Sequence, residues 1–114
     1  MRILCCGDRH WTQKDKVIKV LAALPLDTVI IEGEAPGADS MARDVALSMG
    51  MVVERFPAQW TRYGRAAGPI RNQQMLDARP DKVIAFHADL EHSKGTKDMV
   101  RRARGAGIPV EVIE

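Results

Sequence analysis

The amino-acid sequence predicts an α/β fold: a single Rossmann-like three-layer sandwich, with a mostly parallel sheet of about five strands and helices on both faces. Two observations lead to this prediction. Short apolar runs alternate with amphipathic segments along the chain, and glycine or proline separates most of them. This alternation requires parallel strands joined by right-handed crossovers. The length of 114 residues favours one domain, residues 1–114, whose core needs no disulfide or metal.

The first third of the chain predicts a strand, a helix and a second strand. Residues 3–6 are a short apolar run typical of a buried parallel strand. Thr12 and Asp15 have the spacing of a capping box, so we expect a helix to begin there and to end near Pro25. Residues 28–31 form the second apolar run and predict the second strand.

The middle of the chain predicts a second helix, a third strand and a third helix. Asp39 or its neighbour begins an amphipathic segment that Gly50 ends. Residues 51–53 are expected to form the third strand. A loop without acidic residues follows, and Pro69 suits the first turn of the next helix.

The last third predicts a strand, a helix and a final strand. Residues 82–86 are the fourth apolar run. Thr96 is suited to cap a helix that ends at Gly105 or Gly107. Residues 109–113 complete the set, so the prediction comprises five strands and four helices.

The composition is that of an ordinary globular protein, with 46% apolar and 28% charged residues. It excludes a disordered tail, a collagen-like repeat and a coiled coil. Lys and Arg number 17 against 15 Asp and Glu, giving a net charge of +2. We therefore expect no dedicated nucleic-acid partner, although a local basic patch is compatible with this balance.

The chain shows no signal for a membrane, a metal or a cofactor. Its longest apolar run, Val20–Leu24, is far shorter than the roughly 20 residues that span a bilayer. The apolar N-terminal stretch is too short for a signal peptide, so we expect a cytoplasmic protein. The adjacent residues Cys5 and Cys6 suit a buried strand better than a disulfide, and no His/Cys spacing resembles a zinc site.

The loops after the predicted strands are the expected ligand site, because ligands of such sheets bind at the carboxyl ends of the strands. Gly37 and Gly95 both lie at expected helix starts, where free N–H groups and the helix dipole favour a phosphate. Residues 93–96, Ser-Lys-Gly-Thr, resemble half of a phosphate loop. Neither a complete Gly-x4-Gly-Lys-Ser/Thr motif nor a Gly-x-Gly-x-x-Gly motif after the first strand is present. The alternative for each glycine is a tight turn without a ligand.

Residues 55–76 contain four arginines and no acidic residue. Arginine can hold phosphate oxygens with two hydrogen bonds at once, so this segment suits a phosphorylated ligand. Arg9, which follows the first strand, could reach the same ligand. The alternative is a solvated basic loop.

Aromatic side chains are concentrated in the same loops. Trp11, Tyr63 and His87 are candidates for stacking on a base. For Trp60 we expect instead that the ring packs against the helix next to it.

Six sequence motifs follow one another in a recognisable order. They are Gly7-x-Arg9-x-Trp11, Gly33-x3-Gly37-Ala38-Asp39, Phe56-Pro57-Ala58-x-Trp60, Tyr63-Gly64-x-Ala66-Ala67-Gly68-Pro69-x-Arg71-Asn72, Ala85-Phe86 and Lys94-Gly95-Thr96. In this order, and over nearly the whole chain, they resemble the YspA/YpsA-related branch of the SLOG superfamily. The Gly-Ala-Asp and Ala-Gly-Pro-x-Arg-Asn elements are the most specific.

The resemblance implies a Rossmannoid domain that binds a nucleotide or a nucleotide-derived molecule: a nucleoside phosphate, a nucleotide sugar or an ADP-ribose-like ligand. Relatives in the wider superfamily include phosphoribohydrolases, proteins that hold single-stranded DNA and sensors of signalling nucleotides. Self-association into a homo-oligomer is implied as well. The expected ligand-binding residues are Gly7, Asp8, Arg9, Gly33, Gly37, Ala38, Asp39, Arg65, Arg71, Asn72, Lys94, Gly95 and Thr96.

The sequence departs from the family's pattern in three places. Glu34 stands where the branch often has a second glycine, and Pro36 stands where a basic residue is common. Residues 88–93 form a longer loop than in relatives and could act as a lid. The phosphoribohydrolases carry a catalytic glutamate in a Gly-Thr-x-x-Glu motif, whereas the matching residue here is Met99, which has no proton to transfer.

The sequence leaves three functions open. The first is a module that senses, carries or sequesters a nucleotide-derived ligand. The second is a hydrolase that cleaves the N-glycosidic bond of a nucleoside phosphate or an NAD-derived ligand. Its catalytic acid or base would have to be Asp39, Glu34, Asp8 or Glu91. The third is binding of single-stranded nucleic acid.

Overall fold

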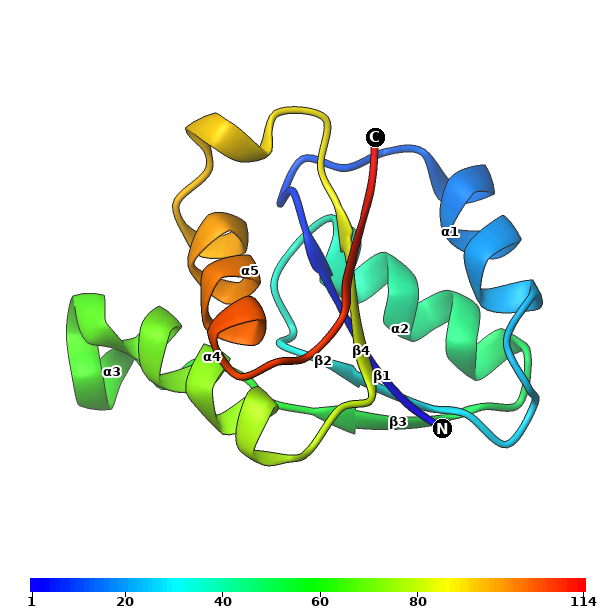
Figure 1. The fold of residues 1–114 in the computed structure, drawn as a ribbon, viewed down its shortest axis with the longest axis horizontal. Coiled ribbons are helices and arrows are strands. Elements are labelled where there is room, and N and C mark those ends of the chain that lie inside the picture. The colour runs from blue at the N-terminus through cyan, green and yellow to red at the C-terminus, as the bar shows by residue number, and fades with distance from the viewer.

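In the computed structural model, which describes residues 1–114, the chain forms a sheet of five parallel strands between two layers of helices (Figure 1). The strands lie in the order β3-β2-β1-β4-β5, so the first strand is central. The predicted Rossmann-like α/β fold is confirmed. The strands are β1 (Arg2–Gly7), β2 (Val29–Glu32), β3 (Val52–Arg55), β4 (Lys82–Phe86) and β5 (Val110–Ile113).

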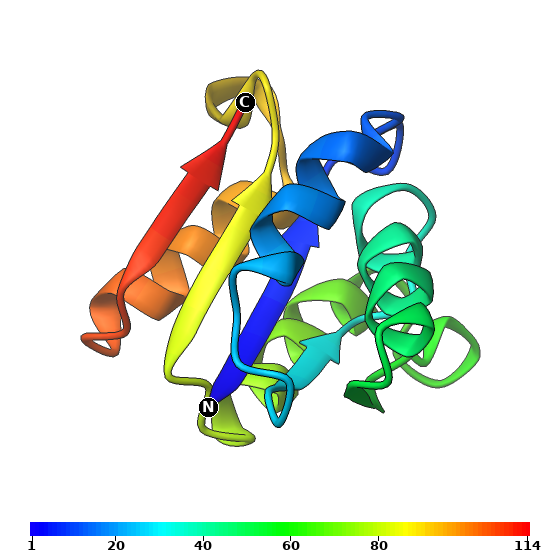
Figure 2. The same ribbon diagram turned by 90° about the vertical axis from the view of Figure 1, so that its right-hand side faces the viewer.

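The helices divide between the two faces of the sheet (Figures 1 and 2). One face is covered by α1 (Lys14–Ala22) and α2 (Ala38–Ser48), and the other by α4 (Ala67–Asp77) and α5 (Gly95–Gly105). A one-turn helix, α3 (Trp60–Tyr63), projects beside α4 and leads into a 3-10 turn at Gly64–Ala66. A second 3-10 turn, Leu90–His92, precedes α5.

The central strand β1 is buried on both faces. Ile3 and Cys5 belong to the core beneath α1 and α2, whereas Leu4 and Cys6 belong to the core beneath α4 and α5. Because neither face meets water, the strand shows an unbroken apolar run instead of an alternating pattern. Burial raises the pKa of both thiols, so the two cysteines are buried apolar groups, as predicted.

Two predicted helix caps are wrong. Helix α1 begins at Lys14, two residues after Thr12, and no side chain caps it; Thr12 instead offers its backbone oxygen to the Lys14 N–H at 3.0 Å. Helix α5 begins at Gly95, so Thr96 lies inside the first turn and is buried. Ser93 provides the cap, since its Oγ accepts the Lys97 N–H at 2.9 Å.

The segment between β3 and α4 differs most from the prediction. Strand β3 continues to Arg55 instead of ending at residue 53, and residues expected to form a plain loop contain α3 and its 3-10 turn. A single helical turn is too short to show a hydrophobic period, which is why the sequence did not indicate it. Pro69 does lie in the first turn of α4, as predicted.

The chain leaves β1 and β4 toward opposite faces of the sheet, which makes the carboxyl ends of these neighbours a topological switch point. The two strand ends are tied together there, because the Asp8 N–H donates to the Phe86 oxygen at 2.9 Å. Gly7 permits this approach, since a Cβ at that position would overlap the Phe86 carbonyl group. No helix is long and apolar enough to cross a bilayer.

Candidate functional site

A chain of hydrogen bonds joins three loops at the carboxyl edge of the sheet. Arg71, on α4, donates from Nη1 to the Gly33 oxygen at the end of β2. Its Nε donates to Asn72 Oδ1 at 3.2 Å, and Asn72 Nδ2 donates to the Gly95 oxygen at 3.3 Å. Residues that the sequence predicted as ligand contacts are therefore brought together, but Arg71 and Asn72 use these groups to bind other parts of the chain.

Asn72 positions the beginning of α5. Its side-chain amide is buried and also donates to Asp98 Oδ2 at 3.0 Å. Arg102 Nε donates to the same Asp98 oxygen at 2.8 Å. Although burial raises the pKa of Asp98, the hydrogen bonds from Asn72 and Arg102 outweigh it and lower the pKa, so this carboxylate is a charged anchor between α4 and α5.

The loop between β2 and α2 binds its own amides with its own carboxylates. Asp39 Oδ2 accepts the N–H groups of Gly33 and Ala35 at 3.1 and 3.4 Å. Glu32 Oε1 accepts the N–H of Glu34 at 2.8 Å. Three consecutive amides of the β2–α2 loop, those of residues 33–35, are thus occupied by the chain itself, and Gly33 and Asp39 have a structural role in this loop.

Burial raises the pKa of Asp39 to about 6, while the nearby Arg71 guanidinium and the two amides oppose the shift. The start of α2 is also used internally, because the Ala38 N–H donates to the Asp8 oxygen at 3.0 Å. Gly37 has a positive φ of 77°, and a Cβ there would overlap the backbone of Asp8 and Arg9. Packing against the β1 loop therefore accounts for glycine at position 37.

Glu32 is an important residue that sequence reasoning missed. It is fully buried, and two buried oxygens, Glu32 Oε2 and Glu34 Oε1, have no hydrogen-bond partner among the other groups of the chain. Burial and the neighbouring Glu34 raise the pKa of Glu32 to about 8, which favours the protonated acid as a hydrogen-bond donor to Glu34. The sign in the sequence that could have revealed it is that Glu32, a carboxyl residue, directly follows the apolar run of residues 28–31.

Glu34 is the charged partner in this pair. The hydrogen bond from Glu32 lowers the pKa of Glu34, and Arg43 lowers it further from 3.0 Å. Arg55 lies 3.7 Å from the other Glu34 oxygen. Glu34 also has a positive φ of 60°, a conformation for which the branch's usual glycine is better suited. Its carboxylate is therefore held by arginines of α2 and β3.

At the beginning of α5 three successive amides have no partner in the chain, whereas at the beginning of α2 the Ala38 amide, between two amides without a partner, is bound by the Asp8 oxygen. The N–H groups of Lys94, Gly95 and Thr96 donate to no atom of the protein, whereas the next amide, Lys97, is capped by Ser93. Gly95 has no positive φ, and a Cβ there would meet nothing within 4 Å. Neither backbone strain nor packing therefore requires glycine at this position, and Lys94 is exposed beside it.

The three predicted stacking residues do not form one group. Trp11 is a core residue at 5% exposure; its ring centroid lies 5.8 Å from that of Phe86, and its Nε1 donates to the Gln13 oxygen, so a base cannot stack on it in this fold. His87 is half-buried and accepts the Asp89 N–H. Tyr63 lies on α3, where Arg62 stands 5.0 Å over its ring.

The remaining predicted residues lie at or near the edge. Arg9 and Arg65 are exposed and form no ion pair. Asp8 is half-buried, and its Oδ1 accepts the His10 N–H at 2.8 Å. Glu91 lies in the predicted lid, residues 88–93, and forms an ion pair with Lys97 of α5 at 3.4 Å. This ion pair connects the lid to α5.

Two hollows in the molecule lie away from the start of α5. A space of about 300 Å³ lies between the beginnings of α1 and α2 and includes Trp11 and Gly37 in its wall. A groove of about 630 Å³ runs between α1 and the strands β4 and β5.

We predict that Gly33 and Arg71 are energetically coupled. A Cβ at Gly33 would lie 2.9 Å from Arg71 Cδ, so Gly33→Ala should destabilise the protein by about 2 kcal/mol. In an Arg71→Ala background the side chain that the new methyl group would strike is absent. Gly33→Ala should then destabilise the protein by at least about 1 kcal/mol less. Urea unfolding of the four variants measures the coupling. Gly95→Ala, where a Cβ meets nothing, is the control, and strictly additive effects would contradict the geometry.

We also predict that stability falls as the pH rises from about 6 to 8. In the folded state Glu32 keeps its proton up to a pKa of about 8, whereas in the unfolded chain it loses it near 4.5. Folding therefore binds a proton in this range, and stability decreases by up to about 1.4 kcal/mol per pH unit. Asp39 contributes in the same direction, but only up to about pH 6.

Glu32→Gln should flatten this pH dependence, because the glutamine amide can donate to Glu34 without titrating. Glu54→Gln is the matched control: Arg2 lowers the pKa of Glu54, so its loss affects stability without altering the slope above pH 6. Unfolding curves at several pH values provide the measurement. An unchanged slope in Glu32→Gln would show that Glu32 is ionised in the folded protein.

Comparisons with known proteins agree with this architecture. The family model YAcAr, described as the YspA, cpYpsA-related SLOG family, matches residues 1–63. The Gene 61 protein of Mycobacterium phage D29 is 36% identical over 118 residues, which cover 96% of this chain and 93% of that protein.

A solved structure shares the fold. DNA processing protein A (DprA) from Streptococcus pneumoniae matches with a TM-score of 0.77 and 22% identity; the match covers 99% of this chain but only 50% of the DprA chain. At this identity the likeness concerns the fold alone. The family match and the phage relative establish the resemblance seen in the motifs: the chain belongs to the YspA, cpYpsA-related SLOG family.

Proposed function

We propose that the chain binds a nucleotide or nucleotide-derived small molecule at the carboxyl edge of the sheet, with a phosphate on the first turn of α5. The observation that carries the proposal is the set of three consecutive unpartnered amides at Lys94, Gly95 and Thr96. Such amides at a helix N-terminus are well suited to an anion. Membership of a SLOG family supports nucleotide-related binding in general terms.

Three features favour α5 over α2 as the phosphate site. The amides of the β2–α2 loop are taken by Glu32 and Asp39, and Glu34 adds a negative charge beside them. At α5, Lys94 supplies a positive charge, and the bare Gly95 allows close approach. The Asn72 hydrogen bonds hold this turn in place before a ligand arrives, which reduces the entropy cost of binding.

The rest of the ligand would extend toward the switch point between β1 and β4, where Asp8 and Arg9 follow the first strand. A carboxylate such as Asp8 can accept hydrogen bonds from ribose hydroxyl groups, and Arg9 is free to pair with a second phosphate. A protein of this kind would sense, carry or sequester its ligand.

We predict that AMP, ADP-ribose or a nucleotide sugar stabilises the protein, by about 2.7 kcal/mol at a ligand concentration 100 times the dissociation constant. Gly95→Asp should abolish this effect by placing a carboxylate at the phosphate position. The same charge is favourable at a helix N-terminus, so the variant should remain as stable as the parent. Thermal unfolding and titration calorimetry with each ligand test both points.

Gly95→Ala is the matched control, because its methyl group fits without contact and leaves the amides in place. It should retain most of the affinity. Equal binding by the parent and Gly95→Asp would reject the α5 phosphate site, and the absence of any response to nucleotides or inorganic phosphate would reject the function.

We further predict little or no release of free base from nucleoside monophosphates. Met99 is buried in the core, and Asp98 is bound by Asn72 and two arginines, so neither can protonate a leaving base. Asp39 is 5% exposed and holds two amides. Chromatography of AMP incubated with the protein is the measurement, and turnover of about 1 s⁻¹ or faster would establish the hydrolase alternative.

A further inference from the structure

The basic residues of the chain are concentrated on one side of the sheet. Residues 60–77 and 94–105 contain eight of the 17 lysines and arginines but only two of the 15 acidic residues, Asp77 and Asp98. These segments include α3, α4 and α5, which lie on the face opposite α1 and α2 (Figures 1 and 2). The net charge of +2 therefore hides a strongly positive face and a negative remainder.

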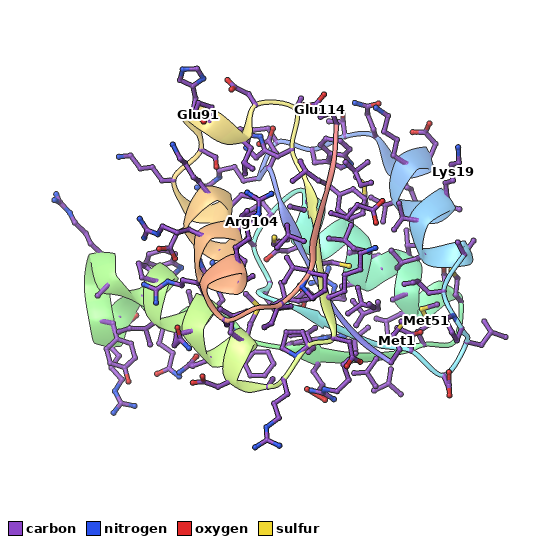
Figure 3. All side chains as sticks on the ribbon, in the orientation of Figure 1. Met1, Lys19, Met51, Glu91, Arg104 and Glu114 are labelled. Carbon is purple, nitrogen blue, oxygen red and sulfur yellow. The ribbon has the colours of Figure 1, made fainter.

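Several of these positive charges are available to a partner. Arg62, Arg65 and Arg104 are exposed, and no carboxylate lies within ion-pair distance of them. Arg101 pairs with Asp98, but its side chain is 78% exposed and can shift toward another anion. Figure 3 shows Arg104 on the α5 side of the molecule and Lys19 on the α1 side.

Two aromatic rings lie on the same face, on the projecting helix α3. Trp60 is 58% exposed, so the expected packing against the helix next to it covers only part of the ring. Its indole lies near Gly68 at the beginning of α4, where a Cβ would be in ordinary van der Waals contact with the ring, at 3.5 Å. The Arg62 guanidinium lies over the Tyr63 ring, 5.0 Å from the centroid of the ring. An exposed tryptophan beside arginines without an ion-pair partner is a combination that can stack on a base and pair with a phosphate.

We propose that the basic aromatic surface formed by Trp60, Arg62, Tyr63 and Arg65, with the exposed Arg101 and Arg104 of α5 on the same side of the sheet, binds single-stranded nucleic acid. Arginines pair with the backbone phosphates, while the rings of Trp60 and Tyr63 stack on unpaired bases. A duplex offers the phosphates but keeps its bases stacked inside, so it would use the charges without the aromatic rings. The surface is distinct from the free amides of α5, and binding here does not depend on the small-molecule proposal.

The test uses fluorescently labelled single strands of DNA and RNA, about 20 nucleotides long, with a duplex of the same sequence for comparison. Anisotropy at low salt should show binding that weakens steeply as salt rises. Arg62→Glu combined with Arg65→Glu should reduce affinity at least about tenfold. Lys14→Glu combined with Lys19→Glu makes the same charge change on exposed residues of α1 and should have a much smaller effect.

Substitutions of Trp60 test base stacking separately from the attraction between arginines and phosphates. Trp60→Ala should weaken single-strand binding by about tenfold through lost stacking, whereas Trp60→Phe should retain most of the affinity. Bound oligonucleotide should quench tryptophan emission, and because Trp11 is buried the quenched signal is that of Trp60. Excess AMP should not displace the strand, since it occupies α5.

Three outcomes would overturn the proposal. The first is no binding of either single strand at low salt. The second is an equal loss of affinity in the α1 control, which would indicate nonspecific attraction. The third is sedimentation showing that Trp60→Ala converts a self-associated protein to a monomer without changing nucleic-acid affinity, which would assign the surface to a second copy of the chain.

Discussion

The contact between Arg71 and Gly33 is the one on which the carboxyl edge depends. Arg71 comes from α4 on one face of the sheet, and its guanidinium reaches the end of β2 beside Asp39. A side chain at position 33 would exclude it. The neighbouring Asn72 continues the connection to Gly95 and Asp98. Two adjacent residues of one helix thus determine the relative positions of the β2 loop and the start of α5.

This arrangement gives the segments that lead into the two helices different properties. In the loop before α2, buried carboxyl groups accept the N–H groups of residues 33–35, and the Arg71 charge limits the cost of burying Asp39. For Glu32 the raised pKa favours the protonated acid, which avoids that cost. At the start of α5, the N–H groups of residues 94–96 donate to no atom of the chain, and the exposed Lys94 lies beside them. One edge therefore combines a loop whose N–H groups are hydrogen-bonded within the chain with a helical turn whose N–H groups can bind an external anion.

Topology also separates charge. Since α1 and α2 cover one face and α3 to α5 the other, the arginine-rich middle of the chain and the basic last helix come to lie together. Only two acidic residues, Asp77 and Asp98, belong to α4 and α5, and the others lie elsewhere in the chain. A small net charge in such a fold is a poor guide to partners, because opposite charges separated by the sheet present two different surfaces to solvent.

The sequence by itself determined the strands, the four long helices and the burial of Cys5 and Cys6, because each follows from local periodicity and from punctuation by glycine and proline. Four residues of the motifs, Gly33, Arg71, Asn72 and Gly95, lie together at one edge of the sheet. Only the tertiary structure decided which of them remain free, since Arg71 meets Gly33 and Asn72 meets Gly95 across separations of 38 and 23 residues. The burial of Trp11, the protonation of Glu32 and the exposure of Trp60 depend in the same way on neighbours that only folding brings into contact.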